Sequence, residues 1–582
     1  MGRFPTRLRA RARRRTLAVA GAATVALLAG ACSGGDAGDA ASTAVKGQLS
    51  VLSLGPVATW DPQRMTSAQD AAFAGRVFLR TLTAFPPGPD AAAQRTVVGD
   101  LATDAGTPND TATSWQFTLR GGVKWQDGSP VTCEDVRHGV ARSFAAPWVS
   151  EGLNYGAAYL DIPRKADGTS VYAGPATTDK AAVAAFDKAV SCDGNTVTFR
   201  LSTPMADWGQ VVASPSFAPV KASQDKGKDG TYAVFSNGPY QLKDPWDPSS
   251  GGTFSRNPNW DKGSDPVRKA QPETIRYLEG TESQTAAQQV LSDDPAHRQS
   301  VTLDSAPPAM QQHILSDTKL KERSVNPTSQ FVDYLAPNFA KGVMRTPAVR
   351  KALALSTNRD GYIAALGGSS AATPTDSLIG PVLPGHRPDS TQPPEPDPGA
   401  ARAALQGAGL TLPVKIRVAY RSTPTADKAM AALMNGWQDA GFAVTLQPLT
   451  KDYFTDISDA SQVDETDVFW ANWAPSWPSG GTMIRPLFDS RLNLTDKSSG
   501  RDYGRFVDAA VDNEIARIGA LTDTAAQAEA WSKLDASLAD RGAYVALAQR
   551  RAFYVAGTDV KGLAANEALG GFVDLATIEV NR

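Results

Sequence analysis

The stretch that decides the fold runs from Trp115 to Phe144 and reads WQFTLRGGVKWQDGSPVTCEDVRHGVARSF. Its first residues alternate between apolar and polar, which is typical of a half-buried strand. A Gly-Gly pair interrupts this pattern, which resumes over Val123–Trp125 and then meets an Asp-Gly turn signal. Thr132 and, three residues later, Asp135 predict a helix that begins with a reciprocal cap. The stretch therefore predicts strand, turn, strand, turn and capped helix in direct succession.

Part of this stretch, Leu119–Val136, resembles the signature of the extracellular solute-binding proteins of family 5, the oligopeptide- and dipeptide-binding components of ABC importers. The signature has leucine-arginine, glycine, valine, an aromatic residue, Asp-Gly, proline and Asp-Val in this order. Cys133 departs from it, because the family usually has alanine there. Asn237–Tyr240, Arg256–Trp260 and Arg350–Arg359 resemble further segments of the family.

The resemblance extends from about Leu49 to Leu563 and implies an α/β fold. The implied architecture is a two-lobed periplasmic-binding-protein-like fold of type II, cluster C, with an extra subdomain inserted in the N-terminal lobe. We expect the signal sequence at 1–31, a flexible tether at 32–46, lobe I at 47–92, 205–298 and 545–582, subdomain Ib at 93–204, and lobe II at 299–544. Within lobe II, the pattern predicts a βαβ unit with its helix over Asp427–Ala440.

The first 31 residues have the features of an export signal. Seven arginines precede an apolar run from Leu17 to Ala31 that is short for a membrane span. Leu28–Cys32 resembles a bacterial lipobox, although Ala29 stands where leucine is usual, so we expect Cys32 to be acylated. An ordinary cleaved signal with an incidental cysteine is the alternative. The small, polar residues that follow predict a tether.

The charge of the chain without this leader argues against nucleic acid as a partner. Removing the seven arginines leaves 51 of the 58 basic side chains against 60 acidic ones, a net charge of about −9. Nucleic-acid binding requires a basic face that neutralises phosphates. The resemblance of Leu28–Cys32 to a lipobox, and not the charge, implies that the protein is held by a lipid on the extracytoplasmic face of the cell membrane.

Cys133 and Cys192 are the only cysteines after Cys32. In an exported chain they would lie where disulfides persist, and two cysteines permit a single pairing. The resemblance places both segments in the same subdomain, so we expect a Cys133–Cys192 disulfide. Two buried free thiols are the alternative.

The sequence contains no motif that points to catalysis. The G-x-S-x-G, H-E-x-x-H, C-x-x-C and G-x-x-x-x-G-K-[ST] patterns are all absent, and the four histidines lie far apart. We therefore expect neither an enzyme, nor a metal site, nor a cofactor. ATP hydrolysis would belong to separate subunits.

The most informative candidate site follows the predicted strand Asp467–Trp473, where ligands of α/β lobes tend to bind. Peptide-binding members of the family carry Trp-x-x-Asp-Tyr/Trp there, and the aspartate pairs with the ligand's α-ammonium. This chain keeps the aromatic residues as Trp473 and Trp477 but has Ser476 in place of the acid. Either another acid supplies the charge, or the ligand has no free α-ammonium at this point. Core packing is the alternative role for the two tryptophans.

Four further residues are weaker candidates for ligand contact, carried over from the family by position: Met65, Thr66, Asn237 and Gly238. Glycine allows a backbone to approach a ligand closely. A bare turn at Asn237-Gly238 and a loop without ligand contact at Met65-Thr66 are the alternatives.

Together these features predict a monomeric, lipid-anchored substrate-binding component of an ABC importer. It would capture a small peptide or peptide-like solute between two hinged lobes and deliver it to a membrane permease. Three alternatives stay open. The same architecture could bind an oligosaccharide, a siderophore or a modified peptide. It could sense peptides without importing them, or act as an extracellular hydrolase.

Overall fold

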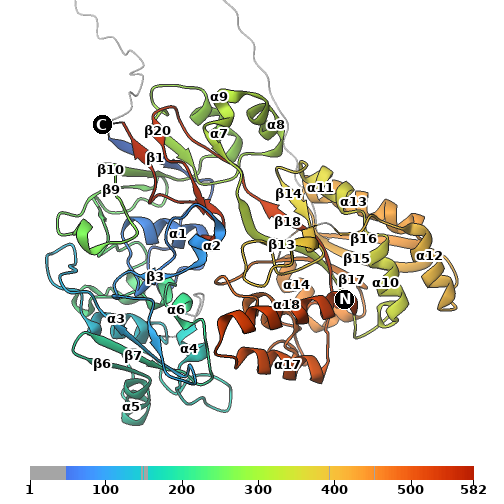
Figure 1. The fold of residues 1–582 in the computed structure, drawn as a ribbon, viewed down its shortest axis with the longest axis horizontal. Helices are drawn as coiled ribbons and strands as arrows, with labels where there is room; N and C mark the ends of the chain where they lie inside the picture. Colours follow the sequence, from blue (N-terminus) through green and yellow to red (C-terminus); the bar gives the residue numbers. More distant parts are fainter. Residues whose placement is uncertain (1–46, 146–148, 150–154, 392, 451, 582) are drawn as a thin grey trace, which may run out of the picture. The chain divides into compact units, whose positions relative to one another are not determined.

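The computed structural model describes residues 47–145, 149, 155–391, 393–450 and 452–581 (Figure 1). The expected signal sequence and tether, residues 1–46 with Cys32, lie outside the described residues. The described chain contains the two lobes and the inserted subdomain that the resemblance implied.

Lobe I is built on a five-stranded sheet. Its strands are, in spatial order, β11 (Ser300–Thr302), β1 (Gln48–Leu52), β10 (Thr274–Leu278), β9 (Gly252–Arg256) and β8 (Tyr240–Leu242). β1 is parallel to β10 and β11, whereas β9 is antiparallel to β10 and β8. The helix α1 (Ala68–Val77) is capped by Ser67, whose hydroxyl accepts a hydrogen bond from the Asp70 N–H. It packs Phe73 and Val77 into the core of this lobe.

Subdomain Ib contains the stretch that begins at Trp115. Its antiparallel sheet has the order β4 (Thr107–Pro108), β5 (Ser114–Thr118), β7 (Thr196–Arg200) and β6 (Val190–Asp193). Trp115 and Phe117 are buried and Gln116 and Thr118 are exposed, so the predicted alternation is confirmed. The helix α3 (Cys133–Arg142) begins with the predicted capping box of Thr132 and Asp135.

The second strand predicted in this stretch, Val123–Trp125, does not form. The chain makes only an isolated bridge between Lys124 and Pro130. The physical reason is the tight turn that follows, in which the Gly128 N–H bonds the Trp125 carbonyl and the Trp125 N–H bonds the Ser129 carbonyl. The turn folds the segment back on itself before it can pair with a neighbouring strand.

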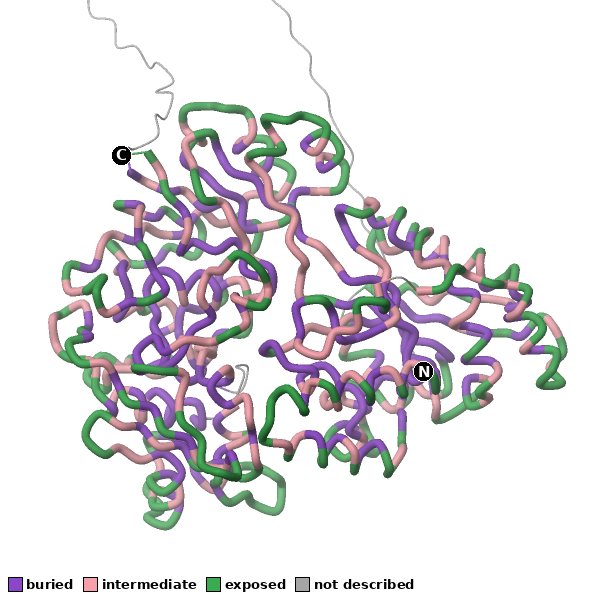
Figure 2. Tube along the Cα trace, viewed as in Figure 1, coloured by how far each residue is buried: buried purple, intermediate pink, exposed green. Residues whose placement is uncertain are grey.

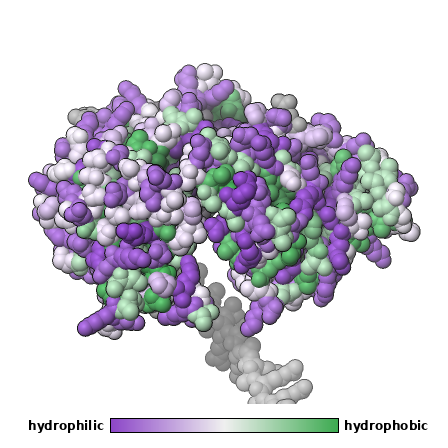
Figure 3. Space-filling view, turned by 60° about the horizontal axis from the view of Figure 1, so that its bottom comes forward, coloured by the Kyte–Doolittle hydropathy of each residue, from purple (hydrophilic) through white to green (hydrophobic). Residues whose placement is uncertain are grey.

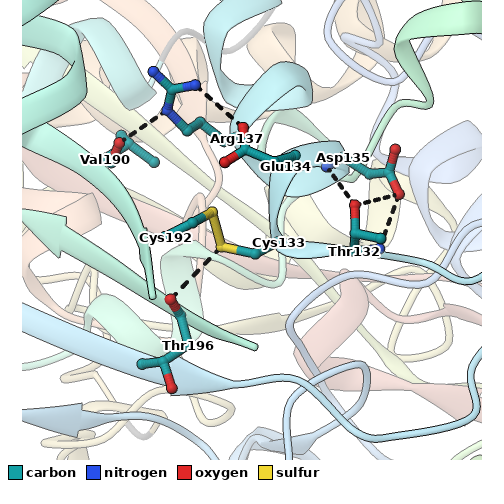
Figure 4. The surroundings of a disulfide bond; sticks show 8 residues. All are labelled: Thr132, Cys133, Glu134, Asp135, Arg137, Val190, Cys192 and Thr196. Carbon is teal, nitrogen blue, oxygen red and sulfur yellow. Dashed lines mark hydrogen bonds and ion pairs between the residues drawn. A yellow bond between two sulfur atoms is a disulfide. The ribbon is translucent and has the colours of Figure 1, made fainter. Parts of the chain in front are cut away.

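A disulfide joins Cys133, the first residue of α3, to Cys192 in β6 (Figure 4). The two Cα atoms are 5.9 Å apart, and 59 positions separate the residues in the sequence. Arg137 of α3 also donates a hydrogen bond to the Val190 carbonyl of the same strand, at 3.2 Å. The disulfide thus ties the beginning of α3 to the edge of the sheet.

Lobe II is built on a six-stranded sheet. Its strands are, in spatial order, β14 (Ala372–Pro374), β18 (Val545–Arg551), β13 (Thr328–Pro337), β17 (Val468–Trp473), β15 (Val414–Arg421) and β16 (Phe442–Leu449). β15 pairs in parallel with both β16 and β17, and the helix α13 (Pro424–Asp439) connects β15 to β16. The predicted βαβ unit is therefore confirmed.

Successive residues of the central strands face two separate cores in lobe II, and buried segments follow these strands in Figure 2. Leu335 packs against one core and Tyr334 and Ala336 against the other. The first core is covered by α10 (Pro347–Leu355), α11 (Arg359–Leu366), α12 (Pro398–Gly407) and α13. The second is covered by α14 (Tyr453–Ser458), α15 (Gly481–Phe488), α17 (Ala509–Gly519) and α18 (Thr524–Asp540). Helices therefore cover both faces of a mixed sheet, in which β15 pairs in parallel with β16 and β17 while the other neighbouring strands pair antiparallel.

Both boundaries between the lobes lie later in the chain than the expected 298/299 and 544/545. Ser300–Thr302 pairs with β1 and belongs to the sheet of lobe I, whereas Val545–Arg551 pairs with β13 and belongs to lobe II. The chain crosses near β12 (Ser324–Val325) and β19 (Tyr554–Val555), which pair with each other. Backbone pairing decides which sheet a short strand joins, and the composition of these strands does not reveal it.

None of the helices within the described residues combines the length and the apolar character that a membrane crossing requires. Figure 3 shows one face of the molecule, where hydrophilic side chains are widespread and hydrophobic patches lie between them.

Candidate functional site

The loop between β17 and α15 lies between two cavities. The larger has a volume of about 810 Å³ and is lined by subdomain Ib and lobe II. The smaller has a volume of about 340 Å³ and is lined by lobe I, subdomain Ib and lobe II. Four residues line both cavities: Tyr155, Ser476, Trp477 and Arg501. The predicted loop is therefore the element at which the lobes meet around empty space, which is where a hinged receptor holds its ligand.

Trp477 connects lobe II to subdomain Ib. Its side chain is 7% exposed and belongs to the hydrophobic core of the subdomain. The ring centroid lies 5.4 Å from that of Tyr155 and 6.2 Å from that of Tyr159, and both pairs are edge-to-face. The indole Nε1 donates a hydrogen bond of 2.5 Å to Oδ2 of Asp207. Most of the Trp477 ring is therefore an interlobe contact, and only part of it lines the cavities.

Trp473 and Ser476 face the cavities more openly. Trp473 lines the smaller cavity, and its indole donates to the Thr482 carbonyl at 2.9 Å. The Arg501 guanidinium lies 5.0 Å from the Trp473 ring centroid, which is within the range of a cation–π contact. Ser476 is exposed. These two residues are accordingly the better candidates for direct ligand contact in this loop.

The charges around the two cavities are predominantly positive. Among the described residues that line them, Asp207 is the one acid, and Arg164, Arg485 and Arg501 are arginines. Arg76 and Arg268 also line the smaller cavity, but they are paired with Asp574 at 2.7 Å and with Asp100 at 2.9 Å. Burial raises the pKa of Asp207, and the hydrogen bond from Trp477 opposes this effect. The electrostatic environment of the site therefore favours a carboxylate of the ligand over an ammonium group.

The remaining four candidates do not line either cavity. The Asn237 side chain is buried, and it accepts from the Arg80 N–H at 2.8 Å and donates to the Arg80 carbonyl at 3.1 Å. A Cβ at Gly238 would lie 2.8 Å from the Phe78 carbonyl carbon, so this glycine allows close packing of backbone on backbone. Met65 lies in the core of lobe I, and Thr66 is exposed. The alternative, a structural turn, is thus the better account of Asn237-Gly238.

The sequence interpretation missed several residues of the site. Asp207, Tyr155, Arg485 and Arg501 come from segments far apart in the chain and belong to no recognisable motif. Folding brings them to the loop that the sequence did single out. An acid just before a tryptophan, as in Asp207-Trp208, is too common a pair to indicate a site.

Asp502, next to Arg501, gives the stability of lobe II a pH dependence. Its side chain is 3% exposed, and burial raises its pKa from 3.8 to about 8. Because the folded state then holds the proton more tightly than the unfolded state, stability decreases as the pH rises from 4 to 8. We expect the effect of Asp502→Asn on the free energy of unfolding to be more stabilising at pH 9 than at pH 5 by ~4 kcal/mol, because the wild type loses about 1.4 kcal/mol for each pH unit between 5 and 8. Urea unfolding at both pH values measures this.

The control for this prediction is Asp508→Asn. The pKa of Asp508 is lowered by Arg541, so this substitution should destabilise the protein at both pH values. An equal effect of Asp502→Asn at pH 5 and pH 9 would contradict the buried-acid interpretation.

Comparisons with known proteins agree with this arrangement. Residues 96–493 match the model for bacterial extracellular solute-binding proteins, family 5. The periplasmic murein peptide-binding protein MppA of Escherichia coli K12 is 25% identical over 420 residues, which is 69% of this chain and 71% of MppA.

Solved structures share the fold. The clavulanic acid biosynthesis oligopeptide-binding protein 2 has a TM-score of 0.81 at 24% identity, over 92% of this chain and 95% of that one. The unliganded open form of MppA has a TM-score of 0.72 at 20% identity, over 92% and 98% of the two chains. Solute-binding proteins are not enzymes, in agreement with the absence of catalytic motifs from the sequence. The chain belongs to family 5 of the bacterial extracellular solute-binding proteins.

Proposed function

We propose that this protein captures a peptide-like solute between its two lobes and delivers it to the membrane permease of an ABC importer, whose ATPase subunits are separate. The observation that carries the proposal is the pair of cavities around Ser476 and Trp477, to which both lobes contribute. The names of two similar proteins, a murein peptide-binding protein and an oligopeptide-binding protein, support peptides as the class of solute.

Capture in this proposal is a shift between open and closed arrangements of the lobes. A ligand that contacts both lobes binds the closed arrangement more tightly, and this difference in affinity sets how far the population shifts. Trp477 adds an interlobe contact that exists only when lobe II meets subdomain Ib. The permease would recognise the closed arrangement.

The charges of the cavities indicate how a peptide would lie. Arg485 and Arg501 can hold a carboxylate, and a planar guanidinium is well suited to bind it through two hydrogen bonds. Ser476 carries no charge to pair with an α-ammonium. We therefore place a carboxylate of the solute, rather than its amino terminus, near the loop after β17.

Native mass spectrometry of freshly purified protein tests the proposed function. We expect an additional mass that fragments as a peptide or an amino-acid derivative and that is exchanged by added peptides without turnover. A bound oligosaccharide or siderophore would replace the peptide assignment with the non-peptide alternative. Hydrolysis of the added peptides would contradict a receptor, and unchanged uptake after deletion of the gene would favour a sensor.

We also propose that Cys32 carries the lipid anchor. Changing Cys32 to serine removes the thiol that is acylated, so the variant should appear in the medium while the wild type stays with the membrane fraction. Fractionation followed by immunoblotting measures this. Membrane retention of the variant, or a mature N-terminus of the wild type at a residue other than Cys32, would contradict lipidation.

A further inference from the structure

Lobe II contains a separate cavity of about 200 Å³ that the sequence did not indicate; we call it the lobe II cavity. The strands β15, β17 and β18 run in the same direction, and the cavity lies at their carboxyl ends. Arg421, Asn472 and Arg550, each in one of the last two positions of these strands, line it together with Thr423 and Thr425 at the beginning of α13. Ligands of open α/β sheets bind outside such strand ends.

Asp333 on the adjacent strand β13 makes this cavity unusual. The residue is 1% exposed, and its Oδ2 accepts a hydrogen bond of 2.9 Å from the Tyr362 hydroxyl. That hydroxyl in turn accepts one of 2.9 Å from the indole Nε1 of Trp470. The second oxygen, Oδ1, is buried and has no hydrogen-bond partner among the described residues. A buried carboxylate oxygen without a donor is costly, so its presence in the centre of a sheet indicates a missing partner.

A positive charge lies beside this carboxylate. Nη1 of Arg550 is 3.5 Å from Oδ2 of Asp333, and it too is buried without a hydrogen-bond partner among the described residues. Arg421 adds a second guanidinium to the wall, and Asn472, directly opposite Asp333 in the sheet, adds an amide. The cavity thus offers one carboxyl and two guanidinium groups within a small volume. Burial raises the pKa of Asp333, Arg550 opposes this effect, and a bound ammonium would oppose it further.

We propose that the lobe II cavity binds an α-amino-carboxylate group, with its ammonium on Oδ1 of Asp333 and its carboxylate on Arg550 and Arg421. A cation alone would meet two guanidinium groups without compensation, and an anion alone would meet the Asp333 carboxylate. A group that carries an ammonium and a carboxylate on the same carbon can pair with the Asp333 carboxylate and with the two guanidinium groups at once. The volume of about 200 Å³ suits such a head group but not a whole peptide.

This inference rests on the proposed function, since it assigns a part of the solute that the protein captures. It also answers the question raised by Ser476: the acid that pairs with an ammonium group is Asp333, in lobe II, rather than a residue of the loop after β17. The head group can belong to a free amino acid or to a peptide-like solute, and the test distinguishes the two.

Fluorine NMR of the full chain labelled with 5-fluorotryptophan tests the inference at the cavity itself. The signal of Trp470 reports on the lobe II cavity and that of Trp473 on the smaller cavity between the lobes; Trp470→Phe and Trp473→Phe assign them. The probes are L-alanine and γ-glutamylalanine, in which the γ-linked glutamyl residue keeps a free amino group and a free carboxylate on its α-carbon. Each probe is also used as the α-N-acetyl and the α-carboxamide derivative. We expect the fluorine signal of Trp470 to shift when the unmodified probe is added. With either derivative, the shift at the same probe concentration should be at least ten-fold smaller.

Asp333→Asn should reduce the response of Trp470 at least ten-fold. The matched control is Asp467→Asn. Asp467 is another buried carboxylate, just before the first residue of β17 and so at the opposite end of this strand. It accepts hydrogen bonds from Arg417 and does not line the cavity. A response to L-alanine assigns the cavity to free amino acids, and a response to γ-glutamylalanine alone assigns it to an α-amino-carboxylate group that belongs to a larger, peptide-like solute.

Three results would overturn the inference: no response of Trp470 to either probe, equal responses to the N-acetyl derivatives, or equal responses of the wild type and Asp333→Asn. The comparison of derivatives uses the wild type and stays decisive if the variant does not fold. A shift of Trp473 without Trp470 would leave the proposed function intact and reject only the lobe II cavity. Failure of the proposed function would instead show as a non-peptide mass in the native spectrum.

Discussion

Replacing Trp477 by alanine is expected to weaken binding of the captured solute about 100-fold, or ~3 kcal/mol. The indole is inserted into the core of subdomain Ib and bonded to Asp207, while its backbone belongs to lobe II. In the proposed mechanism these contacts form only when lobe II closes on subdomain Ib, so their loss should raise the free energy of the closed form and leave that of the open form unchanged. Isothermal titration calorimetry with the solute identified by mass spectrometry measures the change.

Two further variants separate the contributions of the ring and of the hydrogen bond. Trp477→Phe keeps most of the edge-to-face packing and loses the donor to Asp207, so we expect a decrease of about ten-fold. Trp260→Ala removes a partly buried tryptophan of lobe I that lines neither cavity, and should leave the affinity unchanged. If Trp477→Ala binds as tightly as the wild type, the residue packs in the core without contributing to closure.

Removing the disulfide is expected to lower the free energy of unfolding by about 4 kcal/mol. The bond closes a loop across a separation of 59 positions, and the chain-entropy model relates the stabilisation to the logarithm of this length. The double variant Cys133→Ala with Cys192→Ala should therefore unfold at a clearly lower urea concentration. Unfolding in urea followed by circular dichroism measures the difference.

The reducing agent dithiothreitol supplies the control for this prediction. Reduced wild type should unfold at nearly the same urea concentration as the double variant, and the variant itself should not respond to the agent. Thiol titration of the denatured, unreduced soluble part should find no free thiol. Two titratable thiols, or equal stability of wild type and variant, would contradict the bond.

The sequence alone determined the family and much of the local structure. The alternation in Trp115–Phe117, the cap at Thr132 and the βαβ unit around α13 are all present in the structure. These features depend on neighbours in sequence, because strand periodicity, turn residues and helix caps act over a few positions. The single possible pairing of Cys133 with Cys192 also follows from counting.

Only the tertiary structure decided where the lobes begin and which residues surround the cavities. The membership of Ser300–Thr302 and Val545–Arg551 in their sheets depends on backbone pairing between distant segments. The sequence predicts that Trp477 binds the ligand, whereas in the structure most of its ring is buried against subdomain Ib. Asp207 and Asp333 belong to no sequence motif. In the structure, Asp207 accepts a hydrogen bond from Trp477, and Asp333 lines the lobe II cavity. Local pattern specifies each element, but the partner that a side chain meets is set by the packing of elements far apart in the chain.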